Sequence, residues 1–220
     1  MRRLLVVAAL AGTCAAAAAA PAAATNECKG LQVCVPVAGP WVLAAPGLVQ
    51  FQLSCPKRFI VGGLDAEVSS RGIEVGFVGS LGSPVNPGVT TTSSAVFLGR
   101  LVRGRDPAPA FRPHLGCIPA SGGGGRVPTA YHAFPPSRPS ARRVTVVFVH
   151  DGTRRRVTAR CARGEHLLTA THAIGFPAQP TAAEAHAVLV TQHTARRGVT
   201  LTIASHTGAV VQIDLVCGAL

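Results

Sequence analysis

The sequence predicts an all-β fold built from two small, disulfide-stapled, sandwich-like modules, and three observations support this prediction. Apolar and polar residues alternate in short segments rich in valine, threonine and isoleucine, which is typical of strands with one buried face. Glycine and proline are abundant, at 24 and 17 residues, as expected where many turns separate short strands. Four cysteines close strand-like alternations, as in residues 49–55 and 211–217, so they share a face with the aliphatic side chains.

The chain begins with a predicted leader. Two arginines precede an apolar, alanine-rich stretch from Leu4, and small residues at 22–24 fit the rule for cleavage before Thr25. We therefore expect residues 1–24 to be a signal peptide and the mature protein to be secreted, with a retained membrane anchor as the alternative. Cys14 follows Thr13, which does not match a lipoprotein signal, so Cys14 is expected to leave with the leader. No later apolar segment is long enough to span a bilayer.

Six of the seven cysteines remain in the mature chain, which in an oxidising compartment predicts a disulfide framework. Sequence alone leaves many pairings open. The favoured set pairs neighbours along the chain: Cys28 with Cys34, Cys55 with Cys117, and Cys161 with Cys217. The alternative is a zinc site, which the spacing disfavours because no Cys-x-x-Cys pair is present and no histidine pair has cysteine partners. We expect no metal and no cofactor.

The first half of the mature chain divides into a preamble and a module. Residues 25–47 form a preamble with the close pair Cys28 and Cys34 and the only tryptophan, Trp41. Residues 48–118 form the first β module. Its strands are expected at residues 48–54, 58–61, 73–78, 95–102 and 111–118.

Residues 119–142 are predicted to link the two modules. Four consecutive glycines at 122–125 give flexibility, and the prolines of 134–139 give stiffness, a composition typical of linkers. A long loop inside one domain is the alternative.

Residues 143–220 form the second β module. Its strands are expected at residues 144–149, 155–161, 166–171, 187–194, 199–204 and 209–217. The sequence His150-Asp151-Gly152 predicts a hairpin turn, because Asp-Gly supplies the positive φ angles of a tight turn. Thr181 and Glu184 have capping-box spacing, so a short helix is expected over 181–187.

Module size, strand spacing and cysteine separation resemble those of immunoglobulin-like and fibronectin-like sandwiches. The resemblance implies a disulfide between the two sheets of each module. The sequence departs from true immunoglobulin domains because no tryptophan lies between the paired cysteines, and the only tyrosine, Tyr131, falls in the predicted linker.

Two short segments resemble trypsin-like serine proteases. Residues 60–63 read Ile-Val-Gly-Gly, as at the mature N-terminus of that family, and residues 168–172 resemble the segment with its catalytic histidine, here His172. The only serine downstream is Ser205, and Gly-Asp-Ser-Gly-Gly is absent, so both segments are interpreted as ordinary strands. A secreted hydrolase using His172 with Ser205 or a bound metal is kept as the alternative function. Asp65 and Glu67 share a strand face, but the preceding glycines favour a turn there.

Charge is the remaining indication of function. Without the two leader arginines, the formal charge falls from +12 to +10, and nearly all of the basic residues are arginine. Aromatic residues are too sparse for nucleic-acid stacking, so specific nucleic-acid binding is not expected. We predict a non-enzymatic protein that binds anionic envelope or extracellular polymers, with a merely solvated basic surface as the alternative. No oligomeric state is predicted. The candidate residues are Arg142, Arg143, Arg154, Arg155 and Arg156.

Overall fold

A computed structural model describes residues 25–78, 93–120 and 140–219 of the chain. Thirteen strands and one short helix make up the regular structure of these residues, so the protein is nearly all-β, as predicted. The elements are β1 Val35–Ala38, β2 Trp41–Leu43, β3 Val49–Ser54, β4 Phe59–Val68, β5 Ile73–Val78, β6 Ser94–Leu101, β7 Ala110–Pro119, β8 Ser140–Val149, β9 Thr153–Arg160, β10 Glu165–Phe176, α1 Ala182–His186, β11 Val188–Ala195, β12 Gly198–Ser205 and β13 Ala209–Ala219.

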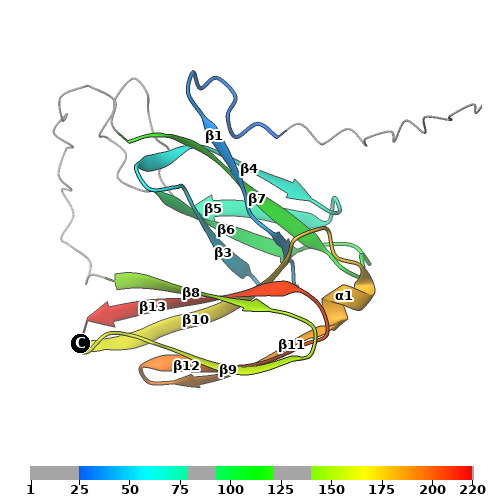
Figure 1. The fold of residues 1–220 in the computed structure, drawn as a ribbon, viewed down its shortest axis with the longest axis vertical. Coiled ribbons are helices and arrows are strands. Elements are labelled where there is room, and N and C mark those ends of the chain that lie inside the picture. The colour runs from blue at the N-terminus through cyan, green and yellow to red at the C-terminus, as the bar shows by residue number, and fades with distance from the viewer. Residues whose placement is uncertain (1–24, 79–92, 121–139, 220) are drawn as a thin grey trace, which may run out of the picture.

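The strands form three antiparallel sheets arranged in layers (Figure 1). The largest has seven strands: six follow the order β1-β7-β2-β10-β13-β8, and β4 pairs with the other edge of β7. The two smaller sheets have the orders β3-β6-β5 and β11-β12-β9. The sheet β11-β12-β9 is the outermost layer of the C-terminal half, and no other sheet of the described residues covers its outer face (Figure 1).

Two separate clusters of buried residues lie between these layers. The first is centred on Phe97, Phe111 and Leu115, and the second on Leu201, Ile203 and Ile213. Each cluster contains one long-range disulfide, Cys55–Cys117 or Cys161–Cys217, and a third disulfide joins Cys28 to Cys34. These are the three pairings expected from the sequence, and the two long-range ones agree with the alternation that directs their cysteines toward the core layer.

The two halves of the chain share the large sheet. β2 pairs with β7 on one side and with β10 on the other, so residues expected in a preamble connect the halves. Gln212 strengthens the junction from the other layer. Its side-chain amide accepts from the Gln52 N–H at 2.6 Å and donates to the Gln52 carbonyl at 3.0 Å. The Gln212 side chain thereby takes the place of a strand neighbour along the edge of β3.

All eleven strands expected from alternation are present, but β4, β8 and β10 extend well beyond their predicted ends. In β4 the extension includes Gly62 and Gly63, which were expected to mark a turn. They lie instead where the pairing of β4 with β7 shifts register. A Cβ atom on Gly63 would lie 1.7 Å from the Glu27 carbonyl oxygen, so this glycine makes room for the N-terminal segment.

The tight turn predicted at residues 150–152 is present, with Gly152 at φ +71° and the Thr153 N–H donating to the His150 carbonyl at 3.1 Å. The flanking strands nevertheless do not form a hairpin ladder. β8 belongs to the large sheet and β9 to the sheet β11-β12-β9, so the turn carries the chain from one layer to the next.

The one helix agrees with its predicted capping box. The Glu184 N–H donates to the Thr181 hydroxyl at 3.3 Å, and the Thr181 N–H donates to the Glu184 carboxylate at 2.8 Å. This backbone hydrogen bond, followed by the one from the Thr181 hydroxyl, lowers the pKa of Glu184. The capping contacts stabilise a helix that is too short to persist by propensity alone.

Most of the predicted linker and the whole predicted leader lie outside the described residues. The linker was placed at 119–142, yet β7 includes Pro119 and β8 begins at Ser140, opposite Gly218 of β13. In the described part of the chain, no helix has the length and hydrophobicity needed to cross a membrane.

Candidate functional site: the arginine-bearing outer face

Two of the five candidate arginines, Arg142 and Arg143, are held in ion pairs. Both lie on β8, and alternation sends them to opposite faces of the strand. Arg143 donates to both Glu165 carboxylate oxygens at 2.8 and 3.0 Å, which raises the pKa of Arg143. The same hydrogen bonds, followed by one from the Ala162 N–H, lower the pKa of Glu165. The charge of Arg143 is therefore matched locally.

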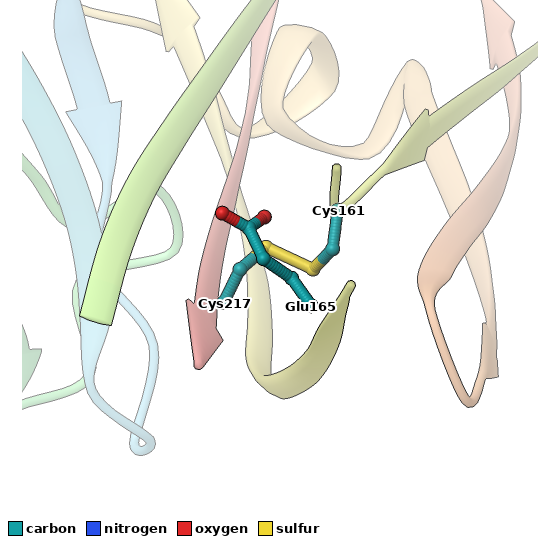
Figure 2. A group of neighbouring side chains, drawn as sticks. All are labelled: Cys161, Glu165 and Cys217. Atoms are coloured by element: carbon teal, nitrogen blue, oxygen red, sulfur yellow. A yellow bond between two sulfur atoms is a disulfide. The ribbon is translucent and has the colours of Figure 1, made fainter. Parts of the chain in front are cut away.

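Glu165 also lies beside the Cys161–Cys217 disulfide (Figure 2). Potential ligand atoms of these three residues lie within 4.8 Å of one another. The two sulfur atoms are bonded to each other, so neither is a thiolate that could bind a metal ion. The cluster has a structural role, because the disulfide and the contacts of Glu165 connect the ends of β9, β10 and β13.

Arg142 pairs with the buried residue Asp214 between the two halves of the chain. The Arg142 guanidinium donates to the Asp214 carboxylate, and it also donates to the Gln50 side chain at 3.1 Å. Asp214 is only 2% exposed. Burial raises the pKa of Asp214, and the attraction and hydrogen bond of Arg142 oppose that rise. Arg142 therefore has a structural partner at the junction.

Asp214→Asn should become progressively more stable, relative to the natural protein, as the pH rises. Because the folded pKa of Asp214 lies above its ordinary value of 3.8, the native state binds this proton more tightly than the unfolded state does. The contribution of Asp214 to stability therefore falls as pH increases from about 4 through the folded pKa, and then stays constant. Urea unfolding of both proteins from pH 3.5 to 7.5 measures the difference, in which the other carboxylates cancel. A difference that is constant over this range, or that moves in the opposite direction, would contradict the prediction.

The other three candidate arginines lie on β9, at the free edge of the sheet β11-β12-β9. Arg154 and Arg156 project from the outer face, and Arg160 joins them because it has the same parity. Arg155 projects from the opposite side of the strand and is also exposed. Among the described residues, no carboxylate pairs with any of these four side chains.

Register places the outer-face arginines beside small and hydroxyl side chains. Arg154 lies opposite Ala204 of β12, Arg156 opposite Thr202, and Arg160 opposite Gly198. The arginines therefore lie along one edge of the sheet, and the outward side chains of the middle strand β12 are short. This arrangement leaves the guanidinium groups free to meet a ligand that lies across β12.

The outer face carries no compensating negative charge, since β9, β11 and β12 contain no aspartate or glutamate. All nine aspartate and glutamate side chains of the chain have a polar partner, and that of Asp151 is His206, which lines the same hollow as Arg154. Unmatched positive charge close together raises the local concentration of anions. The face can therefore attract a polyanion without first breaking an internal ion pair.

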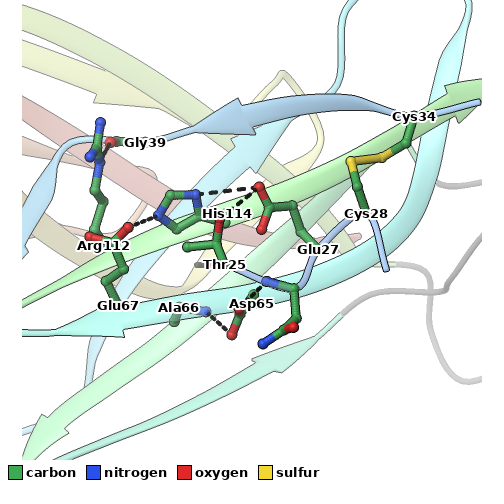
Figure 3. A network of polar contacts seen from close by, with 11 residues as sticks. Thr25, Glu27, Cys28, Cys34, Gly39, Asp65, Ala66, Glu67, Arg112 and His114 are labelled. Carbon is green, nitrogen blue, oxygen red and sulfur yellow. Dashed lines mark hydrogen bonds and ion pairs between the residues drawn. A yellow bond between two sulfur atoms is a disulfide. The ribbon is translucent and has the colours of Figure 1, made fainter. Parts of the chain in front are cut away.

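A second polar cluster, which sequence analysis missed, surrounds the buried residue His114 (Figure 3). His114 Nε2 lies 3.2 Å from the Glu67 carboxylate, and Nδ1 lies 3.9 Å from the Glu27 carboxylate. Glu27 accepts a further hydrogen bond from the Thr25 hydroxyl at 3.1 Å. His114 and Glu27 are 5% and 6% exposed. The imidazole thus lies between two carboxylates, of which Glu27 is almost fully buried and Glu67 is partly exposed.

The N-terminal segment creates this burial by lying across β4 and β7. A Cβ atom on Gly116 would lie 2.0 Å from the Glu27 carbonyl oxygen, so only glycine permits the close approach. The Asn26 N–H donates to the Asp65 carboxylate at 2.7 Å, and the Cys28–Cys34 disulfide closes the segment. The two carboxylates weighed for glycosidase chemistry, Asp65 and Glu67, are therefore occupied in holding the N-terminal segment and His114.

The residues of the hydrolase alternative have other partners. His172 Nδ1 hydrogen-bonds the Gln192 side chain at 2.8 Å, and Gln192 donates to the Ala170 carbonyl at 3.2 Å. Ser205 donates to the Thr207 carbonyl at 2.7 Å. Gln192 lies opposite Leu201 of β12, four residues or roughly 13 Å along the strand from Ser205. The described residues provide no acid hydrogen-bonded to His172.

An apolar hollow of about 430 Å³ lies at the junction of the halves, lined by side chains that include Phe51, Val146, Phe148 and Val210. No arginine, lysine, aspartate or glutamate lines it. The hollow is therefore separate from the basic face and adds nothing to anion binding.

No known protein family, curated protein or solved structure matches this chain.

Proposed function

We propose that this chain is a non-catalytic β protein that binds anionic polymers of the cell envelope or the extracellular space. The binding surface is the outer face of β11-β12-β9. The observation that carries the proposal is that Arg154, Arg156 and Arg160 share one exposed face with no acidic residue on any of its three strands. Exposed guanidinium groups without a carboxylate partner favour carboxylate, sulfate and phosphate ligands because they can donate two parallel hydrogen bonds.

Export of the mature chain is part of this proposal. The three disulfides support it, because structural disulfides persist in oxidising compartments and are rare in the cytosol. The leader at residues 1–24 would deliver the protein to the space where anionic envelope and extracellular polymers occur.

We also propose that the halves are immunoglobulin-like or fibronectin-like sandwich modules joined by the segment around residues 119–142. Support comes from the two buried clusters, each with its own inter-strand disulfide. In this arrangement the N-terminal module braces the inner side of the C-terminal one through β2 and Gln212, which leaves the arginine face outward.

Co-sedimentation of the oxidised mature protein with its own envelope fraction, over a salt series, tests the function. Binding should weaken steeply as salt rises, because the attraction is between screened surface charges. The variant with Arg154, Arg156 and Arg160 all changed to Gln should lose most of the binding. The matched control, Arg143→Gln with Arg155→Gln, removes two arginines outside the proposed face and should bind far better than the triple variant. Equal binding by the triple variant and the natural protein would overturn the proposal.

A further inference from the structure

We propose that the ligand of this face is a linear acidic polysaccharide that lies along β12, an inference that rests on the proposed function. The chemistry of the face is not purely cationic. The arginines lie on the edge strand β9, and hydroxyl groups lie beside them on β12. An acidic polysaccharide offers matching anionic and hydroxyl groups in one chain.

The hydroxyl-bearing part of the face is a shallow lane, which is formed by the outward residues of β12 from Thr200 to Ala204. Thr200, Thr202 and Ala204 project outward, and none is larger than threonine. The lane from Thr200 to Ala204 is roughly 13 Å long, enough for a short run of sugar rings. β9 borders this lane with its arginines, and β11 borders it on the other side. An extended polymer can therefore rest on the lane while the arginines reach it from one edge.

Hydroxyl groups line this lane at its centre. Thr158 of β9 lies opposite Thr200 with the two oxygen atoms 3.1 Å apart. Thr202 lies between Arg156 and Thr191, and neither the Thr202 nor the Thr191 hydroxyl has a hydrogen-bond partner among the described residues. Each hydroxyl can both donate and accept, as can the hydroxyls of a sugar ring. The pattern suits a ligand with many hydroxyl groups better than it suits a bare string of phosphates.

Both ends of the lane are hollowed, and each hollow includes arginine. One, of about 410 Å³, is lined by Arg160, Arg196 and Arg197 at the β11–β12 turn. The other, of about 430 Å³, is lined by Arg154 together with Thr202 and other β11 and β12 residues. Recesses of this size admit a ligand group of a few hundred Å³. A polymer on the lane can therefore present an anionic group to arginine at either end.

Other polyanions fit this face less well. β9, β11 and β12 contain no phenylalanine, tyrosine or tryptophan, so the face lacks the aromatic side chains on which single-stranded nucleic acid bases usually stack. Leu189 is the one large apolar residue exposed on these strands, which is too little to insert into a lipid surface. Polyphosphate would accept hydrogen bonds from the arginines and the hydroxyl groups, but it has no donor to satisfy the acceptor capacity of those hydroxyl groups.

The test compares four probes under one salt condition: oligogalacturonate, dextran sulfate, polyphosphate and neutral dextran. The key variant carries Thr200→Val and Thr202→Val, which keep the shape and the net charge but remove both hydroxyl groups. Thr145→Val, on β8 outside the face, is the matched control. Unfolding curves of each variant establish that the fold is retained.

The double threonine variant should bind an acidic polysaccharide roughly tenfold more weakly than the natural protein does, and should lose distinctly less affinity for polyphosphate. Whether this loss appears with the carboxylated or the sulfated probe identifies the anionic group. Unchanged polysaccharide binding by that variant, or tighter binding of polyphosphate by the natural protein, would overturn the inference but leave the proposed function in place. If the triple arginine variant retains binding to every anionic probe, the proposed function itself fails.

Discussion

His114→Leu is expected to lower the free energy of unfolding by about 3–5 kcal/mol. The imidazole lies within 3.2 Å of Glu67 and 3.9 Å of Glu27, and both His114 and Glu27 are almost fully buried. Leucine fills a similar volume but offers neither carboxylate a partner. The buried Glu27 carboxylate would then lie near that of Glu67 with no imidazole between them, and leaving a buried charge without its partner is costly.

Urea unfolding of the oxidised protein measures this change, and a triple variant separates polarity from packing. In Glu27→Gln, His114→Leu, Glu67→Gln, both carboxylates are neutral as well. It should therefore recover part of the stability lost in the single variant, because no buried charge remains unpaired. A loss below about 0.5 kcal/mol for His114→Leu, in the range of ordinary surface substitutions, would show that the cluster does not hold the N-terminal segment.

Removing the Cys161–Cys217 disulfide should destabilise the protein by roughly 4 kcal/mol. The bond closes a segment with a sequence separation of 56 residues, so its loss restores considerable conformational freedom to the unfolded chain. The paired change to alanine also leaves a small space in the buried cluster around Leu215 and Val199.

The short disulfide provides the comparison. Cys28–Cys34 has a separation of only 6 residues, so replacing that pair by alanine should have a smaller effect, roughly 2 kcal/mol. Urea midpoints of the two double variants, measured under identical conditions, rank the losses. An equal or larger loss from the short disulfide would mean that local structure, and not loop length, determines the contribution of each disulfide.

Strands and disulfides could be predicted because both depend on short-range patterns. Alternation in residues 209–217 defines which face of β13 carries the apolar core residues, and the final cysteine follows the same parity. The capping box of α1 is equally local, since Thr181 and Glu184 are three residues apart. Local patterns of this kind can be recognised without knowing how distant segments of the chain pair.

The shared sheet could not be predicted because its connecting strands are too short to show alternation. β1 has four residues and includes Pro36, and β2 has three. Their pairing partners, β7 and β10, are far away in the sequence. The extension of β4 through Gly62 and Gly63 has a similar cause, since these glycines are explained by contact with a distant segment and not by a turn.

The partners of several polar side chains could not be predicted either, because they come from distant strands that pairing brings together. The sequence shows Arg142 and Arg143 as neighbours of a basic cluster, but pairing across β8, β10 and β13 supplies Asp214 and Glu165 as their partners. His114 was missed because Glu27 and Glu67 come from separate segments. The outer-face arginines were predictable, because alternation along β9 alone places Arg154, Arg156 and Arg160 together.

The most direct test of the arginine face is to map the binding site residue by residue. Backbone amide chemical shifts of the oxidised mature protein would be recorded during titration with oligogalacturonate at low salt. The account predicts that the largest changes lie in β9, β12 and the β11–β12 turn, and that they vanish in the variant with Arg154, Arg156 and Arg160 changed to Gln. Changes concentrated instead around Arg71, Arg103 and Arg105 in the N-terminal half, or spread evenly over all basic residues, would contradict it.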